Sequence, residues 1–247
     1  ATGRAMIDYI EEGVRLCRSG VLAGLVTCPI AKVALKMAGS HDPGHTEMLA
    51  RLTAADEFAM MMAGGRLRVT LVTIHVGLGR VVGLLSPERI FRLIELTGRS
   101  LQRDFALAQP RLAVAGLNPH AGEAGMFGDE EERLIGPAVT RAAAAGWRVT
   151  GPLPPDTVFH KAAAGAFDAV ICMYHDQGLI PFKLLHFEDG VNVTLGLPMV
   201  RTSVDHGTAY DIAGRGVASP VSLDAAFRLA GEIAGNRRRF AEKREMN

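Results

Sequence analysis

The sequence predicts an α/β fold with strands of mixed direction, and three observations support this prediction. The chain has 247 residues, 48% of them hydrophobic, so it can fill the core of one large domain or of two modest lobes. Apolar runs that resemble strands alternate with helical stretches. Three of these runs end on a histidine, at the position where parallel strands present ligand-binding residues; the three are His75, His120 and His175.

A helix, a strand and a hairpin are expected in the first third of the chain. Ile7, Ile10 and Val14 have helical spacing. Gly64-Gly65 separates two strand-like runs, which predicts a tight hairpin. The expected elements are a helix over 3–18, a strand over 24–27, a helix from Pro29 to about 38, a turn-rich crossover over 39–44, and hairpin strands over 57–63 and 66–74.

Helices and strands continue to alternate through the rest of the chain. Pro87 suits the first turn of a helix. Ser222 is a candidate N-cap of the closing helix, which we expect to end at Ala234, before Gly235. The remaining expected elements are helices from 87 toward 107, over 129–145 and over 222–234, and strands over 111–117, 147–150, 169–173 and 191–195.

Charge and cysteine usage favour a small-molecule partner and a location in the cytoplasm. The 27 Lys and Arg residues nearly balance the 26 Asp and Glu residues, so we expect no nucleic-acid partner. No run approaches the roughly 20 apolar residues that cross a bilayer, and we expect neither a membrane span nor a targeting signal. Cys17, Cys28 and Cys172 are too far apart in sequence for a thiolate zinc motif and too few for a disulfide framework, which favours a reducing compartment.

The three histidines at strand ends predict a catalytic metal site. Three neutral imidazoles leave coordination positions open for substrate oxygens, and a bound divalent ion lowers the pKa of an alcohol and polarises the ketone formed from it. Zinc and cobalt suit imidazole best, while magnesium and manganese stay open. The alternative is that each histidine caps its strand by bonding a nearby carbonyl, which is the commoner role of a single histidine.

Two polar segments predict an anionic substrate. His45 and Thr46 precede a helical run, where Thr46 could cap the helix and His45 could donate to a phosphate; an ordinary helix start is the alternative. A second segment contains Lys183, Asn192 and Arg201, whose cations suit a carboxylate or phosphate unless they are ordinary surface charges. Asn192 lies in an apolar run and would need a partner if buried.

No standard dinucleotide motif is present. The segment 77–83 is similar to G-x-G-x-x-G, but its third glycine is at position 83, one residue later than the motif requires. Another segment would therefore have to bind a dinucleotide. Four glycines over 116–128 allow the backbone to approach a ligand closely. The helix that follows begins with the acidic residues 129–132, which would compete with an anion at its N-terminus.

Five motifs stand out along the chain, at 44–47, 118–123, 174–178, 190–198 and 201–209. Together they resemble the 4-hydroxythreonine-4-phosphate dehydrogenase family of pyridoxal-phosphate biosynthesis. The resemblance covers essentially the whole chain and is specific for the family but not for one substrate. It implies a two-lobed α/β/α fold with a mixed sheet, similar to isocitrate and isopropylmalate dehydrogenases. Residues 1–38 with 212–247 would form the remainder of the first lobe, and 39–211 a second lobe carrying the metal, substrate and NAD sites.

The resemblance also implies a reaction and a set of ligands. The substrate's secondary alcohol would be oxidised by NAD to a β-keto acid, which loses carbon dioxide to give 3-amino-2-oxopropyl phosphate. A homodimer would share the metal site, with one histidine donated across the interface. The implied metal ligands are His75, His120 and His175; the implied phosphate ligands are His45 and Thr46; the substrate's polar end would be bound by Lys183, Asn192 and Arg201.

The remaining implied residues concern catalysis and the cofactor. Asp156 matches a family site position, and Lys183 or Asp176 could act as the general base directly or through water, so all three are candidate catalytic residues. The segment 206–214 is similar to the adenosine-binding loop of isocitrate and isopropylmalate dehydrogenases, and it does not distinguish NAD from NADP. The implied cofactor ligands are His206, Gly207, Thr208, Ala209 and Asp211.

One departure from the family pattern affects the expected activity. The family's opening strand and its Gly-Pro-rich loop have no counterpart in this sequence, so we expect an incomplete first lobe that is destabilised unless a dimer covers it. Two alternatives therefore stay open. One is a dehydrogenase of 4-phosphothreonate, 4-phosphoerythronate or a dihydrodiol carboxylate, and the other is an inactive binding protein that keeps the metal pocket.

Overall fold

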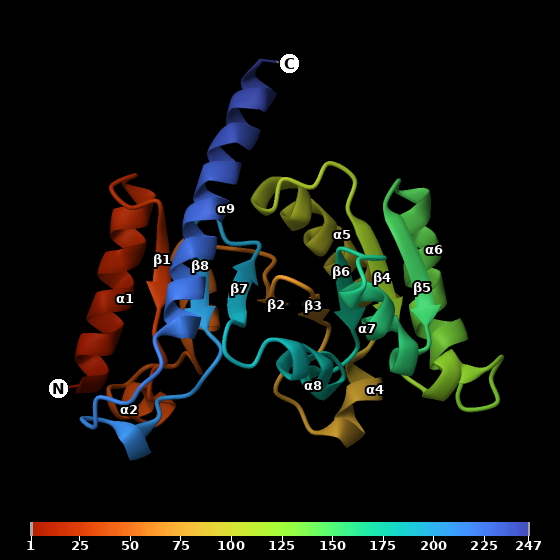
Figure 1. Cartoon of the computed structure of the whole chain (residues 1–247), viewed down its shortest axis with the longest axis horizontal. Helices are drawn as coiled ribbons and strands as arrows, with labels where there is room; N and C mark the ends of the chain where they lie inside the picture. The colour runs from red at the N-terminus through yellow and green to blue at the C-terminus, as the bar shows by residue number, and fades with distance from the viewer. Residues whose placement is uncertain (1, 247) are drawn as a thin grey trace. The chain divides into compact units, whose positions relative to one another are not determined.

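The computed structural model describes residues 2–246, which form two compact units (Figure 1). Unit 1 combines the chain up to Phe58 with the chain from Glu188 onward, and unit 2 is Ala59–Phe187. These bounds differ from the expected lobes, because the segments 39–58 and 188–211 fall in unit 1. The reason is packing: the helix His45–Thr53 contacts the helix Thr2–Arg18, and the strand Gly24–Thr27 extends the ladder formed by Val191–Leu195 and Val200–Val204.

Unit 1 has a short mixed sheet with helices on both faces. β8 pairs in parallel with β1 and antiparallel with β7. On one face, α1, α2 and α3 enclose an apolar cluster that contains Ile7, Ile10 and Leu49. On the other face, α9 crosses the strands, and Thr202 donates its hydroxyl to Ala226 O (Figure 1). The elements are α1 (Thr2–Arg18), β1 (Gly24–Thr27), α2 (Lys32–Met37), α3 (His45–Thr53), β7 (Val191–Leu195), β8 (Val200–Val204), η4 (Tyr210–Ile212) and α9 (Val221–Glu245).

Unit 2 begins with the expected hairpin and continues into parallel strands. β2 and β3 are antiparallel, and β3 then pairs in parallel with β6, β6 with β4, and β4 with β5. The elements are β2 (Ala59–Ala63), β3 (Arg68–Leu71), η1 (Leu78–Arg80), α4 (Val81–Leu84), α5 (Pro87–Asp104), β4 (Arg111–Ala115), η2 (Pro119–Gly122), η3 (Glu131–Ile135), α6 (Gly136–Ala144), β5 (Arg148–Leu153), α7 (Pro155–Ala163), β6 (Ala169–Cys172) and α8 (His175–Leu185).

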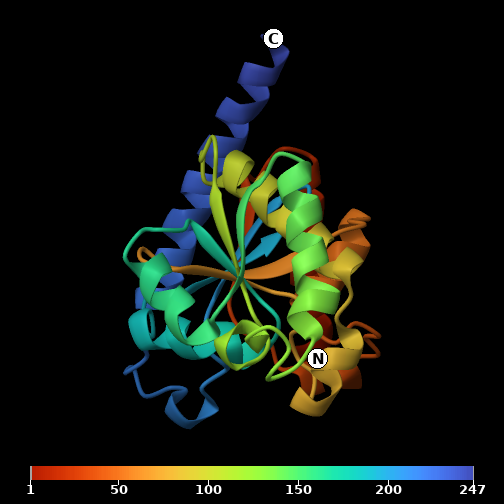
Figure 2. The same ribbon diagram turned by 90° about the vertical axis from the view of Figure 1, so that its right-hand side faces the viewer.

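Helices cover both faces of the unit 2 strands, as Figure 2 shows. α7 and α8 bury Phe159, Leu179 and Phe182 against one face. α5 covers the opposite face, where Thr97 donates to the buried Thr70 hydroxyl across 3.2 Å. Burial on both faces explains why these strands read as continuous apolar runs rather than as alternating ones. The expected α/β class with mixed strand directions is confirmed.

Two expectations for the closing helix were wrong. α9 continues through Gly235 to Glu245, because Ile233 is buried and Arg237 donates to Leu197 O across 3.2 Å just beyond the glycine. These contacts offset the roughly 1 kcal/mol that a helical glycine costs. Ser222 is not the N-cap: it lies inside the helix, where its hydroxyl accepts from Asp205 N and donates to Gly190 O.

The elements that were not expected from the sequence include α7, α8 and β8. α8 contains Gly178 and Pro181, which oppose a helix in isolation, but Leu179 and Phe182 bury its inner face. β8 carries Arg201 as its second residue, which disguises a fully buried strand. α7 begins at Pro155, a first-turn proline that could have predicted it. No helix within residues 2–246 combines the length and apolar composition that a membrane crossing requires.

Candidate active site

The ends of β3 and β6 bring two of the predicted metal ligands together. The parallel pairing places Leu71 beside Cys172, and the backbone amide of Thr73 still donates to Met173 O across 3.2 Å. Because this pairing continues to the strand ends, His75 and His175 emerge side by side, with their ring centroids 5.7 Å apart. The expectation that strand-end histidines converge is therefore met for this pair.

The paired imidazoles line a pocket of about 320 Å³ in unit 2. His175 Nδ1 lies 2.7 Å from Asp176 Oδ1, which orients the ring and leaves Nε2 for another partner. This arrangement of imidazole and carboxylate is typical of histidines that ligate metals. The pocket is lined by Ile74, His75, Val76, Leu78, Val81, Tyr174, His175 and Asp176.

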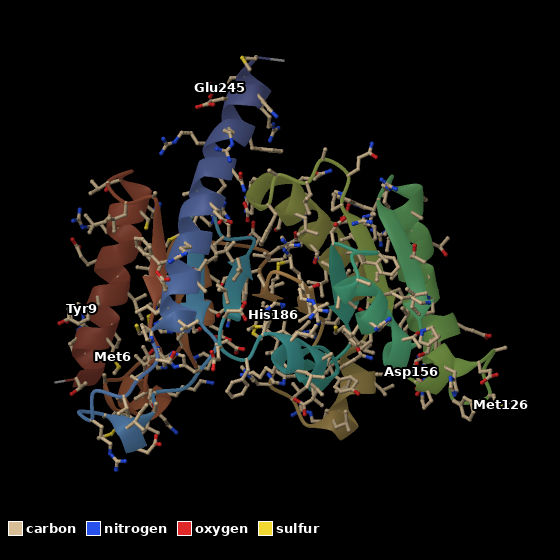
Figure 3. The ribbon with its side chains drawn as sticks, in the orientation of Figure 1. Met6, Tyr9, Met126, Asp156, His186 and Glu245 are labelled. Atoms are coloured by element: carbon tan, nitrogen blue, oxygen red, sulfur yellow. The ribbon has the colours of Figure 1, made fainter. Side chains whose placement is uncertain are left out.

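His120 does not complete a three-ligand cluster within one chain. Among residues 2–246, no group of three or more His, Cys, Asp or Glu side chains is arranged to hold a metal ion. The His120 ring instead lies 6.0 Å from the Phe127 ring, on a loop after β4 whose tip carries Met126 (Figure 3). The residues present thus fit a divalent ion as a two-imidazole half-site that needs further ligands from elsewhere.

Unit 1 holds a buried cation without a carboxylate partner at hydrogen-bonding distance. The Arg201 residue is 3% exposed, and its terminal nitrogens donate to Thr194 Oγ1 across 3.0 Å and to Thr27 Oγ1 across 2.9 Å. Its Nε is buried without a hydrogen-bond partner. Burial lowers the pKa of Arg201 to about 10, and the Glu47 carboxylate opposes that shift, so the side chain stays charged at neutral pH.

A buried acceptor lies on the same face of the strands as this cation. Asn192 pairs with Ser203 across the β7–β8 ladder, so its side chain shares a face with that of Arg201 two residues away. Asn192 Oδ1 is also buried without a hydrogen-bond partner. An unpartnered donor and an unpartnered acceptor on one face are costly unless a ligand satisfies them. This pair suits a ligand with an anionic group and a hydroxyl or ammonium group.

His45 and Thr46 form the first turn of α3, where backbone N–H groups lack helical partners. The N-cap is Gly44 rather than Thr46, so the expected capping role of Thr46 was wrong: the extended backbone of Gly44 starts the helix two residues earlier. Burial and then the positive charge of Arg201 lower the pKa of His45 to about 4. His45 is therefore neutral at pH 7 and keeps one N–H to donate.

The low pKa of His45 predicts an acid-sensitive unit 1. Between pH 6.5 and 4 the unfolded chain protonates this histidine while the folded chain does not, so stability that is present above pH 6.5 is lost as the pH falls, by about 3 kcal/mol at most. We expect His45→Gln to flatten this part of the curve of unfolding free energy against pH, measured by urea denaturation. His41→Gln, at an exposed histidine, is the control, and an unchanged slope in His45→Gln contradicts the assignment.

The other candidate residues lie at exposed or half-buried positions. Asp156 is exposed in the first turn of α7 (Figure 3). Lys183 is half-buried on α8, and its Nζ lies 5.8 Å from the centre of the Phe187 ring. The predicted cofactor segment is exposed around η4, with Ala209 in the left-handed region. It comprises His206, Gly207, Thr208, Ala209 and Asp211.

Sequence reasoning missed the side chains that support these groups. Thr27 and Thr194 hold Arg201, and their hydroxyls inside apolar strands were the available signal. Gln177 joins two strand ends, since its Oε1 accepts from Met173 N and its Nε2 donates to Gly116 O. Glu131 turns back toward the loop before it, although the acidic run was interpreted as a helix start that repels anions.

Comparison with known proteins identifies the family. The family model described as pyridoxal phosphate biosynthetic protein PdxA matches residues 1–230 of this chain. A 4-hydroxythreonine-4-phosphate dehydrogenase of Desulfosudis oleivorans is 63% identical over 235 residues, which cover 93% of this chain and 68% of that protein. The chain belongs to the PdxA family. PdxA membership confirms the family predicted from the five motifs, and with it the oxidoreductase class.

Solved structures agree with the PdxA assignment. A 4-hydroxythreonine-4-phosphate dehydrogenase from Klebsiella pneumoniae matches with a TM-score of 0.88 at 47% identity, over 94% of this chain and 70% of that one. A terephthalate 1,2-cis-dihydrodiol dehydrogenase from Burkholderia xenovorans matches with a TM-score of 0.71 at 30% identity, over 93% of this chain and 73% of that one. The fold is thus shared by PdxA relatives whose names describe different substrates.

Proposed function

We propose that this chain oxidises and decarboxylates 4-phosphohydroxy-L-threonine to 3-amino-2-oxopropyl phosphate, with NAD as the hydride acceptor and a divalent metal ion. The observation that carries the proposal is the pair His75 and His175 at adjoining strand ends of a PdxA-family chain. A dehydrogenase requires a hydride acceptor, so family membership implies a nicotinamide cofactor in general. The preference for NAD, the metal and the substrate are parts of the proposal.

The reaction divides into two steps. In the first, the substrate's hydroxyl proton passes to Lys183 or Asp176, directly or through water, and a bound nicotinamide would accept the hydride from the carbinol carbon. In the second, the bond between the carboxylate and its neighbouring carbon breaks and carbon dioxide leaves. The electron pair of that bond moves toward the new carbonyl, and the carbon that carried the carboxylate is then protonated. His75 and His175 would hold a divalent ion, which would supply Lewis-acid polarisation of the hydroxyl and of the carbonyl formed from it.

The chain's own residues supply binding and orientation. In unit 1, Arg201 and Asn192 bind the substrate's polar end through the two buried atoms that have no other partner. His45 and Thr46 bind phosphate at the start of α3, where free N–H groups favour an anion. The exposed segment 206–211 contacts the adenosine part of NAD. In unit 2, Asp176 holds the His175 ring in one orientation.

The test is turnover with defined substrates. The purified chain, supplied with NAD or NADP and with zinc, cobalt, magnesium or manganese, should form reduced nicotinamide and carbon dioxide in equal amounts from 4-phosphohydroxy-L-threonine. Faster turnover of a terephthalate dihydrodiol, 4-phosphothreonate or 4-phosphoerythronate would replace the substrate but keep the reaction class. Stoichiometric metal binding without turnover of any of them would overturn the proposal in favour of a binding protein.

The proposal includes a homodimer formed through α8. Ile180 and Leu184 are 68% and 85% exposed and lie four residues apart on α8, and Phe187, 76% exposed, follows just beyond the end of the helix; together they form an apolar stripe. Because residues 2–246 bring together two of the three proposed histidine ligands and hold no larger ligand group, a second copy that donates His120 is the occupant that would complete the site. A two-fold interface would bury the stripe of each copy.

Charging the α8 stripe should produce monomers. We expect Ile180→Glu with Leu184→Glu to halve the mass measured by light scattering, because burying each apolar side chain contributes about 2 kcal/mol in each copy. Metal binding should weaken in parallel. Val33→Glu, at a residue 73% exposed on α2, is the matched control. A dimer that survives the double substitution contradicts the assignment of this interface.

The proposal also places the protein in the cytoplasm. All three cysteines are free thiols, with Cys28 exposed and Cys172 buried, which suits a reducing compartment. Burial raises the pKa of Cys172 well above its ordinary value, so this thiol stays protonated and unreactive. Cys172 therefore serves packing rather than catalysis.

A further inference from the structure

The carboxylate of Glu131 faces the loop that carries His120. Glu131 is the first residue of the π-helical turn η3 and is 4% exposed. Its Oε1 accepts from Leu117 N across 2.7 Å and from Asn118 N across 2.8 Å, and its Oε2 accepts from Asn118 Nδ2 across 2.9 Å. A buried carboxylate therefore receives three hydrogen bonds from Leu117 and Asn118, just beyond the end of β4.

The same carboxylate fills the space between two glycines that flank His120. A Cβ at Gly116 would lie 3.1 Å from Glu131 Oε1, and a Cβ at Gly122 would lie 2.7 Å from Oε2. The backbone of each glycine thus approaches the carboxylate so closely that it leaves no room for a side chain, and one glycine lies on each side of the histidine in the sequence. Glu131 contacts the start and the end of the loop at once.

The loop held in this way has an unfavourable backbone. His120, Ala121, Glu123 and Ala124 have φ values of 53°, 55°, 41° and 52°, in the left-handed region that residues with a Cβ rarely adopt. Such conformations persist only where the surroundings fix them, and they are concentrated at functional sites. The three hydrogen bonds to Glu131 are the contacts that fix the beginning of this segment.

A second polar side chain ties this loop to the paired histidines. Gln177, 7% exposed on α8, donates to Gly116 O across 2.6 Å and accepts from Met173 N across 2.7 Å. It lies two residues after His175. The end of β4, which leads to His120, is therefore bonded to the end of β6, which leads to His175.

We propose that Glu131 is a positioning residue for the His120 imidazole: its carboxylate locks the left-handed loop in the conformation that presents this ring to a divalent ion. Gln177 transmits the same constraint to His175. The inference rests on the proposed function for the role of His120 as a ligand. Glu131 itself contacts neither substrate nor metal, because both of its oxygens are engaged by the loop.

The decisive variant is Glu131→Gln, which preserves the volume between the glycines but replaces one acceptor oxygen with a donor. We expect the affinity for zinc or cobalt, measured by competition with a chromophoric chelator, to fall about 10- to 100-fold, the range typical of residues that orient ligands. Hydrogen exchange at the Leu117 and Asn118 amides should accelerate. Excess metal should restore most of kcat, and Glu131→Asp should recover part of the affinity.

Two controls make the outcome unambiguous. Glu132→Gln removes the same charge from an exposed neighbour and should change neither metal affinity nor exchange. His120→Ala tests the ligand itself. Metal affinity unchanged in Glu131→Gln but reduced in His120→Ala overturns the positioning role. Metal affinity unchanged in both overturns it as well, and in that case the failure lies in the proposed ligand set rather than in the loop.

Discussion

Replacing His175 with alanine is expected to lower the affinity for a divalent ion by more than about 100-fold and to abolish metal-dependent turnover. The reason is that a direct ligand contributes more than a residue that only orients one, whose loss typically costs about 10- to 100-fold. His75→Ala should have the same effect, because the two rings lie 5.7 Å apart in one pocket. The affinity for the metal ion is measured by competition with a chelator, and the metal content of the protein is measured after dialysis.

The His175 prediction has a graded companion and a control. Asp176→Asn keeps the size of the side chain but removes the charge next to His175 Nδ1, so metal affinity should fall by about 10- to 100-fold. His160→Ala, at an exposed histidine of α7, should bind metal as the parent chain does. Equal metal affinity in His175→Ala and His160→Ala would remove the basis for the metal site.

Arg201→Met is expected to reduce kcat/KM by about 10- to 100-fold while changing stability little. A hydrogen bond to a charged group contributes about 1.5–3 kcal/mol, and the loss of the one bond that Arg201 Nε makes to substrate accounts for this range. The folded chain loses a cation whose burial is unfavourable, as the lowered pKa of Arg201 indicates. The hydroxyls of Thr27 and Thr194 lose their donor, which offsets that gain.

Paired measurements of steady-state kinetics and urea denaturation test the Arg201 prediction. Arg201→Lys keeps the charge but not the planar fork, so it should recover only part of the activity. Arg228→Met, at an exposed arginine paired with Asp224 on α9, is the control and should leave both measurements unchanged. A kcat/KM in Arg201→Met that equals the control value, or a collapse of stability, would show that the arginine is structural.

The sequence predicted most of the secondary structure because short apolar runs and helix signals are local. The hairpin around Gly64-Gly65, the helix from Pro87 and the histidine at the end of each of three strands could all be located this way. The family followed from five motifs for the same reason, since each motif is a short run of residues. Local patterns failed where tertiary packing overrides propensity, as at Pro181 in α8 and Gly235 in α9.

What the sequence alone determined was the set of chemical groups: imidazoles at strand ends, a lysine and an arginine among apolar residues, and glycines around His120. Only the tertiary structure decided how they are grouped, because strand pairing brings His75 beside His175 and leaves His120 apart within one chain. It also selected the supporting residues. Hydrogen bonds between segments that are distant in sequence give four residues their roles: Thr27, Thr194, Gln177 and Glu131. The order of residues along the chain does not show which of these segments meet in space.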